Sequence, residues 1–161
     1  MAVDAARQGQ AVGRRTIQFS CLRTAKGMIM KILGSCQCKK VQYEAAQIDG
    51  PLWNCFCQTC RKSHAADHNT AARVKSEDFK ITSGENSLRS YESTPGKLRW
   101  FCETCGTHVY AERPAQPGAV VVRAGTFDTD PGVVAESNVW VSHAKPWLQH
   151  DASKPSHDEF P

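Results

Sequence analysis

The sequence lacks several features that would assign it to other classes of protein. No stretch approaches the roughly 20 apolar residues of a membrane-spanning helix, and no compact apolar run resembles a secretory signal. Internal repeats and low-complexity tracts are missing too, which argues against a solenoid or a biased linker. The default expectation is therefore a cytoplasmic globular protein with no membrane partner.

Most of the chain also lacks an excess of basic over acidic side chains. The formal net charge is +4, but the first 27 residues hold five basic side chains and one acidic side chain. The remaining residues carry 15 basic and 15 acidic side chains and are neutral. A nucleic-acid-binding protein needs a clustered basic surface, so we expect no nucleic-acid partner.

No long helical period runs through the sequence, and the pattern of apolar and polar residues changes at Met28. Residues 1–27 show neither a sustained period nor strand alternation, and we predict a disordered extension there. Cys21 lies in this extension and is given no role. Residues 28–148 are predicted to form one domain, followed by a loose tail over 149–161.

Short apolar or alternating segments, separated by turn signals, fill the predicted domain. Thr94-Pro95-Gly96 is the clearest hairpin turn among them. The segment 63–70 has no clear period and is predicted to be a loop with at most one helical turn. Many short strands without long helices indicate an all-β fold, with strands expected near 28–33, 41–45, 52–54, 73–75, 79–81, 88–92, 97–101, 108–110, 119–123 and 138–141.

What the sequence has in abundance is cysteine, eight in 161 residues. Cys55, Cys57 and Cys60 form a C-x-C-x-x-C run that is too tight for comfortable disulfides. Three thiolates converging from one turn suit Zn²⁺, and three protein ligands leave a fourth position open, which is typical of catalytic zinc. His64 follows closely enough to close the site as a fourth ligand, so a closed Cys₃His site is the alternative. His68, His108 and His143 are taken as ordinary surface or strand residues.

Two further cysteine pairs predict a second metal site. Cys36 and Cys38 lie in one turn, and Cys102 and Cys105 lie in a C-x-x-C-G knuckle. Together they make the Cys₄ ligand set of a structural zinc. Closing the intervening loop costs about 4 kcal/mol, and zinc binding of roughly 10–16 kcal/mol exceeds that cost. The sequence therefore predicts two zinc ions per chain.

These motifs resemble one known family, the glutathione-dependent formaldehyde-activating enzymes and centromere protein V. The similarity spans about residues 30–148 and keeps the family's order of motifs, which are Gly34-Ser35-Cys36-x-Cys38, Cys55-x-Cys57-x-x-Cys60-Arg61-Lys62, Phe101-Cys102-x-x-Cys105-Gly106, Ala124-Gly125-Thr126-Phe127-Asp128 and Lys145-Pro146-Trp147. The resemblance implies a β-tent of short antiparallel sheets. It also implies structural zinc on Cys36, Cys38, Cys102 and Cys105, and catalytic zinc on Cys55, Cys57 and Cys60.

The activity implied by the resemblance is that of a carbon–sulfur lyase acting on a thiol–aldehyde adduct similar to S-hydroxymethylglutathione. Its partners would be a small thiol such as glutathione and an aldehyde such as formaldehyde, with the thiol held as thiolate at the open zinc position. The chain departs from the family where Phe56 replaces a frequent histidine and Ala65 a nearby glycine. His68 stands about where the family has an aromatic residue. A non-catalytic, zinc-stabilised β-tent binding module is the alternative function, because a fold does not determine an activity.

Overall fold

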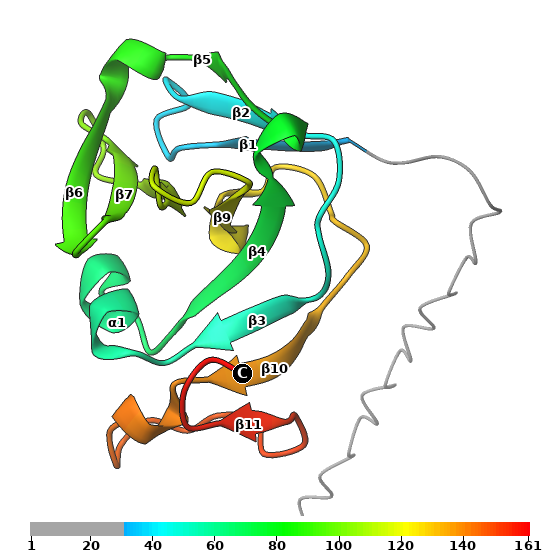
Figure 1. Cartoon of the computed structure of the whole chain (residues 1–161), viewed down its shortest axis with the longest axis vertical. Helices are drawn as coiled ribbons and strands as arrows, with labels where there is room; N and C mark the ends of the chain where they lie inside the picture. The colour runs from blue at the N-terminus through cyan, green and yellow to red at the C-terminus, as the bar shows by residue number, and fades with distance from the viewer. Residues whose placement is uncertain (1–30) are drawn as a thin grey trace, which may run out of the picture.

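The computed structural model describes residues 31–161, and these residues form two sheets (Figure 1). The predictions for residues 1–27 and for the strand's start at 28–30 lie outside the described residues. The smaller sheet has the order β1-β2-β5, and the larger has the order β11-β10-β3-β4-β9-β8-β7-β6. The prediction of an all-β fold is confirmed.

The elements are short, as the turn signals predict. The strands are β1 (Ile32–Ser35), β2 (Gln42–Ala45), β3 (Leu52–Cys55), β4 (Asn69–Lys75), β5 (Phe79–Ser83), β6 (Leu88–Thr94), β7 (Lys97–Cys102), β8 (His108–Glu112), β9 (Ala119–Arg123), β10 (Ala135–Val139) and β11 (Ser156–His157). One α-helix, α1 (Gln58–His64), is found in the described part of the chain, besides single 3₁₀ turns at Ser76–Asp78, Glu85–Ser87, Ala124–Thr126 and Val141–His143.

Most neighbouring strands pair antiparallel, but β10 pairs parallel with both β3 and β11. The short antiparallel sheets implied by the resemblance are therefore present, with parallel pairing only at this edge of the larger sheet within the described residues. Parallel neighbours need a long connection, and β3 and β10 are separated by most of the domain. This pairing places Val139 beside Cys55, so the late strand supports the start of the cysteine triplet.

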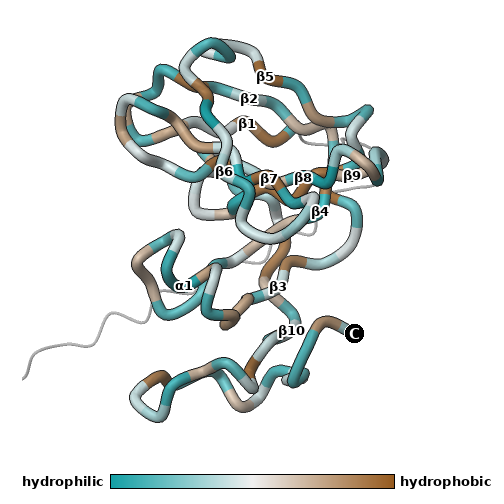
Figure 2. Tube along the Cα trace, turned by 60° about the vertical axis from the view of Figure 1, so that its left-hand side comes forward, coloured by the Kyte–Doolittle hydropathy of each residue, from teal (hydrophilic) through white to brown (hydrophobic). Residues whose placement is uncertain are grey.

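The main core lies between the two sheets. Tyr43 of β2 is 1% exposed and packs with apolar side chains of the larger sheet, including Val109 and Val122. Figure 2 shows the hydrophobic stretches of β7, β8 and β9 at the middle of the molecule. Gly34 lies against the ring of Tyr43, where a Cβ atom would overlap the phenol. Glycine is therefore required just before the first cysteine turn.

Two segments differ from the sequence prediction. The region 63–70, expected as a loop with at most one helical turn, contains the end of α1 and also the start of β4. The segment expected as a loose tail contains β11, and the side chain of Asn138 donates hydrogen bonds to the Asp151 carbonyl and the Ser156 hydroxyl. No helix among residues 31–161 is long and apolar enough to cross a membrane.

Candidate metal centres

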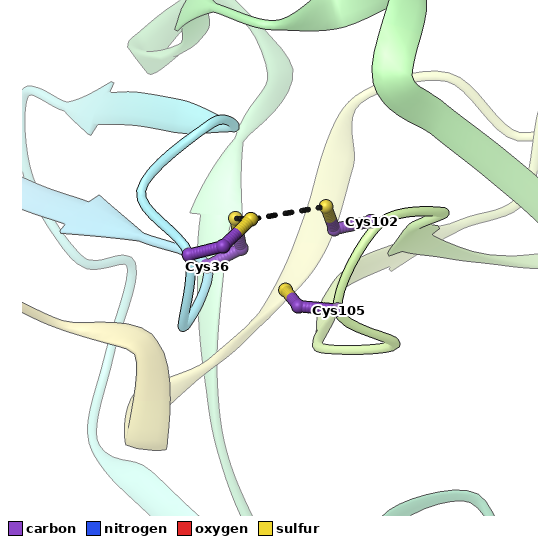
Figure 3. A group of neighbouring side chains, drawn as sticks. Cys36, Cys102 and Cys105 are labelled. Atoms are coloured by element: carbon purple, nitrogen blue, oxygen red, sulfur yellow. Dashed lines mark hydrogen bonds between the residues drawn. The ribbon is translucent and has the colours of Figure 1, made fainter.

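The first cysteine cluster brings two distant turns together. The ligand sulfurs of Cys36, Cys38, Cys102 and Cys105 all lie within 4.8 Å of one another, and Figure 3 shows labelled side chains from both turns pointing toward a common centre. The Sγ–Sγ distances are 3.5 Å for Cys36–Cys38 and 3.8 Å for Cys38–Cys102. These exceed the disulfide bond length of about 2 Å. They match the roughly 3.8 Å edge of a tetrahedron with metal–sulfur bonds of about 2.3 Å.

Backbone hydrogen bonds shape both turns around this centre. In the first turn Lys39, at φ 60°, donates its N–H to the Cys36 carbonyl over 2.8 Å, and the Val41 N–H donates to the Cys36 sulfur over 3.3 Å. In the second turn Gly106, at φ 73°, donates to the Cys102 carbonyl over 2.8 Å. Left-handed residues close each turn sharply enough for two thiols to share one side.

The second cluster contains three thiols, from the end of β3 and the first turns of α1. The sulfurs of Cys55, Cys57 and Cys60 also lie within 4.8 Å of one another. Cys57 is the N-cap of α1, and its sulfur accepts a hydrogen bond from the Cys60 N–H over 3.3 Å. Cys55 and Cys60 are buried, while Cys57 is partly exposed. The cluster therefore has a buried side and a side closer to the surface.

His64 does not complete this ligand group in the structure. Among residues 31–161, no histidine nitrogen, other cysteine sulfur or carboxylate oxygen lies within 4.8 Å of all three sulfurs. The His64 ring instead lies 5.1 Å from the His108 ring, centroid to centroid. Burial, with the nearby Arg123 and His108, lowers the pKa of His64 to about 4, so its imidazole is neutral at pH 7.

A buried arginine lies against the triplet. Arg99 of β7 is 3% exposed, and its two terminal nitrogens lie 3.9 and 3.8 Å from the Cys60 sulfur. Its Nε donates to the Ser93 hydroxyl over 2.9 Å, which fixes the guanidinium. The neighbouring Cys55 and Cys57 thiols, followed by the Arg99 and Arg123 charges, lower the pKa of Cys60. A thiolate is thus favoured at this position before any metal binds.

The motif residue Arg61 anchors the helix that carries Cys60. Its Nε donates to the Phe56 carbonyl over 3.2 Å, and its Nη2 donates to the His143 carbonyl over 3.1 Å. Phe56, which stands where the resemblance expects histidine, is 1% exposed, and its ring centroid lies 5.0 Å from that of His68. Phe56 is therefore a buried packing residue within the cysteine turn.

A pocket of about 370 Å³ opens beside α1. Its lining comprises Ser63, His64, His68, Asn69, Thr70, Gly106, Thr107, His108, Arg123, Gly125 and Thr126. These residues come from the end of α1, from the starts of β4 and β8 with the residues just before them, from the end of β9 and from the 3₁₀ turn that follows it. Cys60 and His64 are four residues apart on one helix and so share a face, which places the pocket next to the cysteine triplet.

Ala65, near which the resemblance expects a glycine, introduces strain at the end of α1. Ala65 is the C-cap and adopts φ 47° and ψ 42°, a left-handed conformation that costs a non-glycine residue roughly 1–2 kcal/mol. We expect Ala65→Gly to raise the free energy of unfolding by up to about 1 kcal/mol, part of the gain being lost to unfolded-chain entropy. Chemical denaturation measures the change. Ala144→Gly, at φ −61°, is the control and should give no stabilisation.

Sequence reasoning missed the buried polar residues around the triplet. Arg99 and Arg123 are only 3% and 4% exposed. Each occurs within a strand whose sequence alternates or is mostly apolar, and an arginine in such a strand is the sequence feature that could have indicated a buried charge. His68 and His108, taken as ordinary residues, line the pocket together with His64, whereas His143 lies in the 3₁₀ turn after β10.

These features define a class of protein, an all-β fold that carries two cysteine clusters able to hold metal ions. A family model described as glutathione-dependent formaldehyde-activating enzyme matches residues 31–143. The chain belongs to this family. None of the curated proteins compared with it matches.

A solved structure supports the same fold. The crystal structure of a Rhodobacter sphaeroides protein is similar to this chain with a TM-score of 0.53 and 26% sequence identity. The match covers 66% of this chain and 98% of the bacterial one. The structural similarity therefore extends over nearly the whole length of that smaller protein.

Proposed function

We propose that the protein is a zinc-dependent carbon–sulfur lyase that interconverts a thiol–aldehyde adduct with its free thiol and aldehyde. The observation that carries the proposal is the contrast between the two clusters, one with four thiols and one with three. The family description, which names glutathione and formaldehyde, supports a small thiol such as glutathione as the substrate.

The two ligand sets fit zinc in different roles. Thiolate-rich tetrahedral sites select zinc or iron–sulfur clusters, and single-ion Cys₄ sites are typical of structural zinc. Cys36, Cys38, Cys102 and Cys105 would hold the structural ion. Cys55, Cys57 and Cys60 would hold the second ion, which with an open position supplies the Lewis acidity that keeps a substrate sulfur as thiolate.

In the lyase direction the S–CH₂OH carbon–sulfur bond breaks and its electron pair stays on sulfur. The hydroxyl oxygen becomes the carbonyl oxygen of formaldehyde, and its proton passes to water. Arg99 offsets negative charge at Cys60 and so favours the thiolate form of the ligand set. The pocket next to α1 provides room for the rest of the substrate, which orients the adduct.

The test must separate enzymatic turnover from spontaneous condensation of thiol with formaldehyde. NMR exchange spectroscopy on glutathione and its hydroxymethyl adduct measures the interconversion rate with and without the zinc-loaded protein. We expect the rate to rise at least roughly 100-fold with the protein, a modest requirement for an enzyme. Cys57→Ser should abolish the rise.

Two controls complete the experiment. Lys62→Ala, on α1 but outside both ligand groups, should accelerate exchange as the wild type does. Cobalt substitution reports thiol entry independently, because new thiolate-to-metal charge-transfer absorption should accompany binding. If glutathione and other small thiols give neither acceleration nor a spectral change, the lyase proposal is wrong and the binding-module alternative takes its place.

A further inference from the structure

All the buried side-chain nitrogens that lack a hydrogen-bond partner within residues 31–161 belong to one pocket. They are Nε2 of His64, Nδ2 of Asn69, Nδ1 of His108, and Nε and Nη2 of Arg123, and each of these four residues lines the pocket beside α1. A buried polar group without a partner is costly, because it has lost its hydrogen bonds to water without replacing them. Four such residues around one space indicate that a polar ligand completes them.

Arg123 gives the strongest indication of the ligand's chemistry. It is 4% exposed, and the ion pairs formed within the described chain all involve other residues. Burial, followed by the nearby Arg99 charge, lowers its pKa to about 10, so the guanidinium stays protonated at neutral pH. A buried cation without a counter-ion is costly, and an incoming anion would remove that cost.

The free nitrogens of Arg123 select a planar anion. Nε and Nη2 lie on the same edge of the guanidinium, where their N–H bonds are parallel and match the two oxygens of a carboxylate. Asn69 adds an amide donor without a partner. Burial, followed by Arg123, lowers the pKa of His108, and His64 is likewise neutral at pH 7. One guanidinium among neutral groups suits a monoanion better than a phosphate dianion.

The charge of the cysteine triplet does not already satisfy Arg123. Three thiolates with one divalent cation carry a single net negative charge, and Arg99 at the Cys60 sulfur offsets it. Before a thiol binds, Arg123 is then the unbalanced cation of the site. The triplet attracts Arg123 electrostatically, but no sulfur accepts a hydrogen bond from its Nε or Nη2 in the described chain.

We propose that this pocket is a carboxylate-binding subsite and that Arg123 makes the protein selective for thiol substrates that carry a carboxylate near the sulfur. Asn69 contributes the second donor, and the two neutral histidines form a polar wall. The assignment of the carboxylate to the thiol substrate rests on the lyase function proposed above. The pocket's preference for a carboxylate can be tested separately.

The experiment compares matched probes by isothermal titration calorimetry on the zinc-loaded protein. The probes are 3-mercaptopropionate, the neutral 3-mercaptopropanol, and 3-(methylthio)propionate, whose sulfur is blocked. Because hydrogen bonds to charged groups are strong, wild type should bind 3-mercaptopropionate at least roughly tenfold more tightly than 3-mercaptopropanol. Arg123→Gln should erase this preference while leaving 3-mercaptopropanol binding unchanged.

Two further variants test the role of the guanidinium shape and control for the loss of an arginine elsewhere. Arg123→Lys retains the charge but loses the fork, and should lose most of the preference even if Arg123→Gln fails to fold. Arg113→Gln removes an arginine that bonds the Pro95 carbonyl outside this pocket and should behave as wild type. Inorganic phosphate at matched concentration should not displace the carboxylate probes.

The outcomes separate this inference from the lyase proposal. If both thiols bind wild type equally, or if Arg123→Gln weakens both equally, the carboxylate subsite is wrong while the thiol site stands. If 3-(methylthio)propionate binds in an Arg123-dependent manner but a free thiol adds no affinity, the subsite stands and the lyase proposal fails. Binding of neither carboxylate probe, or displacement by phosphate, overturns the subsite.

Discussion

Cys38→Ser is expected to unfold the domain, whereas Cys57→Ser is expected to leave it folded with one metal site fewer. The sulfur of Cys38 lies 3.5 Å from that of Cys36 and 3.8 Å from that of Cys102, across 64 residues of sequence. Loss of one ligand from a closed thiolate site removes much of a binding energy of roughly 10–16 kcal/mol. A domain of this size is stable by only about 5–15 kcal/mol, so the loss should be decisive.

The triplet joins residues that are already neighbours in the sequence, so its metal should contribute less to folding. Cys55 is held by the pairing of β3 with β4 and β10, and α1 is held by the Arg61 bonds to the Phe56 and His143 carbonyls. Cys57→Ser also replaces the capping sulfur with a hydroxyl oxygen, which can cap α1 in its place.

Circular dichroism and metal analysis of both cysteine variants decide between these expectations. Cys57→Ser should keep the β-sheet spectrum and bind about half the metal of the wild type, as expected when one of two sites is lost. Gln37→Ala, in the same turn as Cys38 but with no ligand atom, should keep both metals and the fold. Equal unfolding of Cys38→Ser and Cys57→Ser would contradict the division into a structural and an open site.

The cysteine groups could be predicted from the sequence because their geometry is local. A C-x-C turn and a C-x-x-C-G knuckle each place two thiols together, and the remaining triplet does the same within one turn. The strand Ala119–Arg123 was predicted with its observed limits because a β-branched run between turn residues has few other solutions. The hairpin of β6 and β7 followed from the turn residues Thr94-Pro95-Gly96, whose backbone preferences favour a tight turn.

What escaped prediction depends on contacts between distant segments. Helix α1 has seven residues and no apolar period, and it is held by the Arg61 bond to the His143 carbonyl. Strand β11 has two residues and exists through its pairing with β10. The burial of Arg99 and Arg123 follows from the stacking of sheet and helix around the triplet. Sequence alternation predicts which residues share a face, but it does not show that a charged side chain faces inward.

Arg99→Gln is expected to weaken metal binding at the triplet while leaving the four-thiol site unchanged. The guanidinium lies 3.8 Å from the Cys60 sulfur and favours its thiolate form. Without that charge, protons compete better with the metal for the ligand set. Loss of a supporting group behind a metal ligand typically lowers metal affinity about 10–100-fold, and the same range is expected here.

A competition titration, in which a chelating dye is added to the metal-loaded protein, should resolve the two sites of Arg99→Gln. The weaker site should lose its metal to the dye first. Arg99→Lys keeps a positive charge and should lose less affinity than Arg99→Gln, since the electrostatic part survives while the fixed fork does not. Arg89→Gln, at an exposed arginine paired with Glu103 on the same hairpin, is the matched control and should titrate as wild type.

Because lower pH protonates thiolates, the affinity deficit of Arg99→Gln should widen as the pH falls from 8 toward 6. Unchanged affinity at the triplet in Arg99→Gln, with the fold intact by circular dichroism, would show that Cys60 does not depend on this arginine.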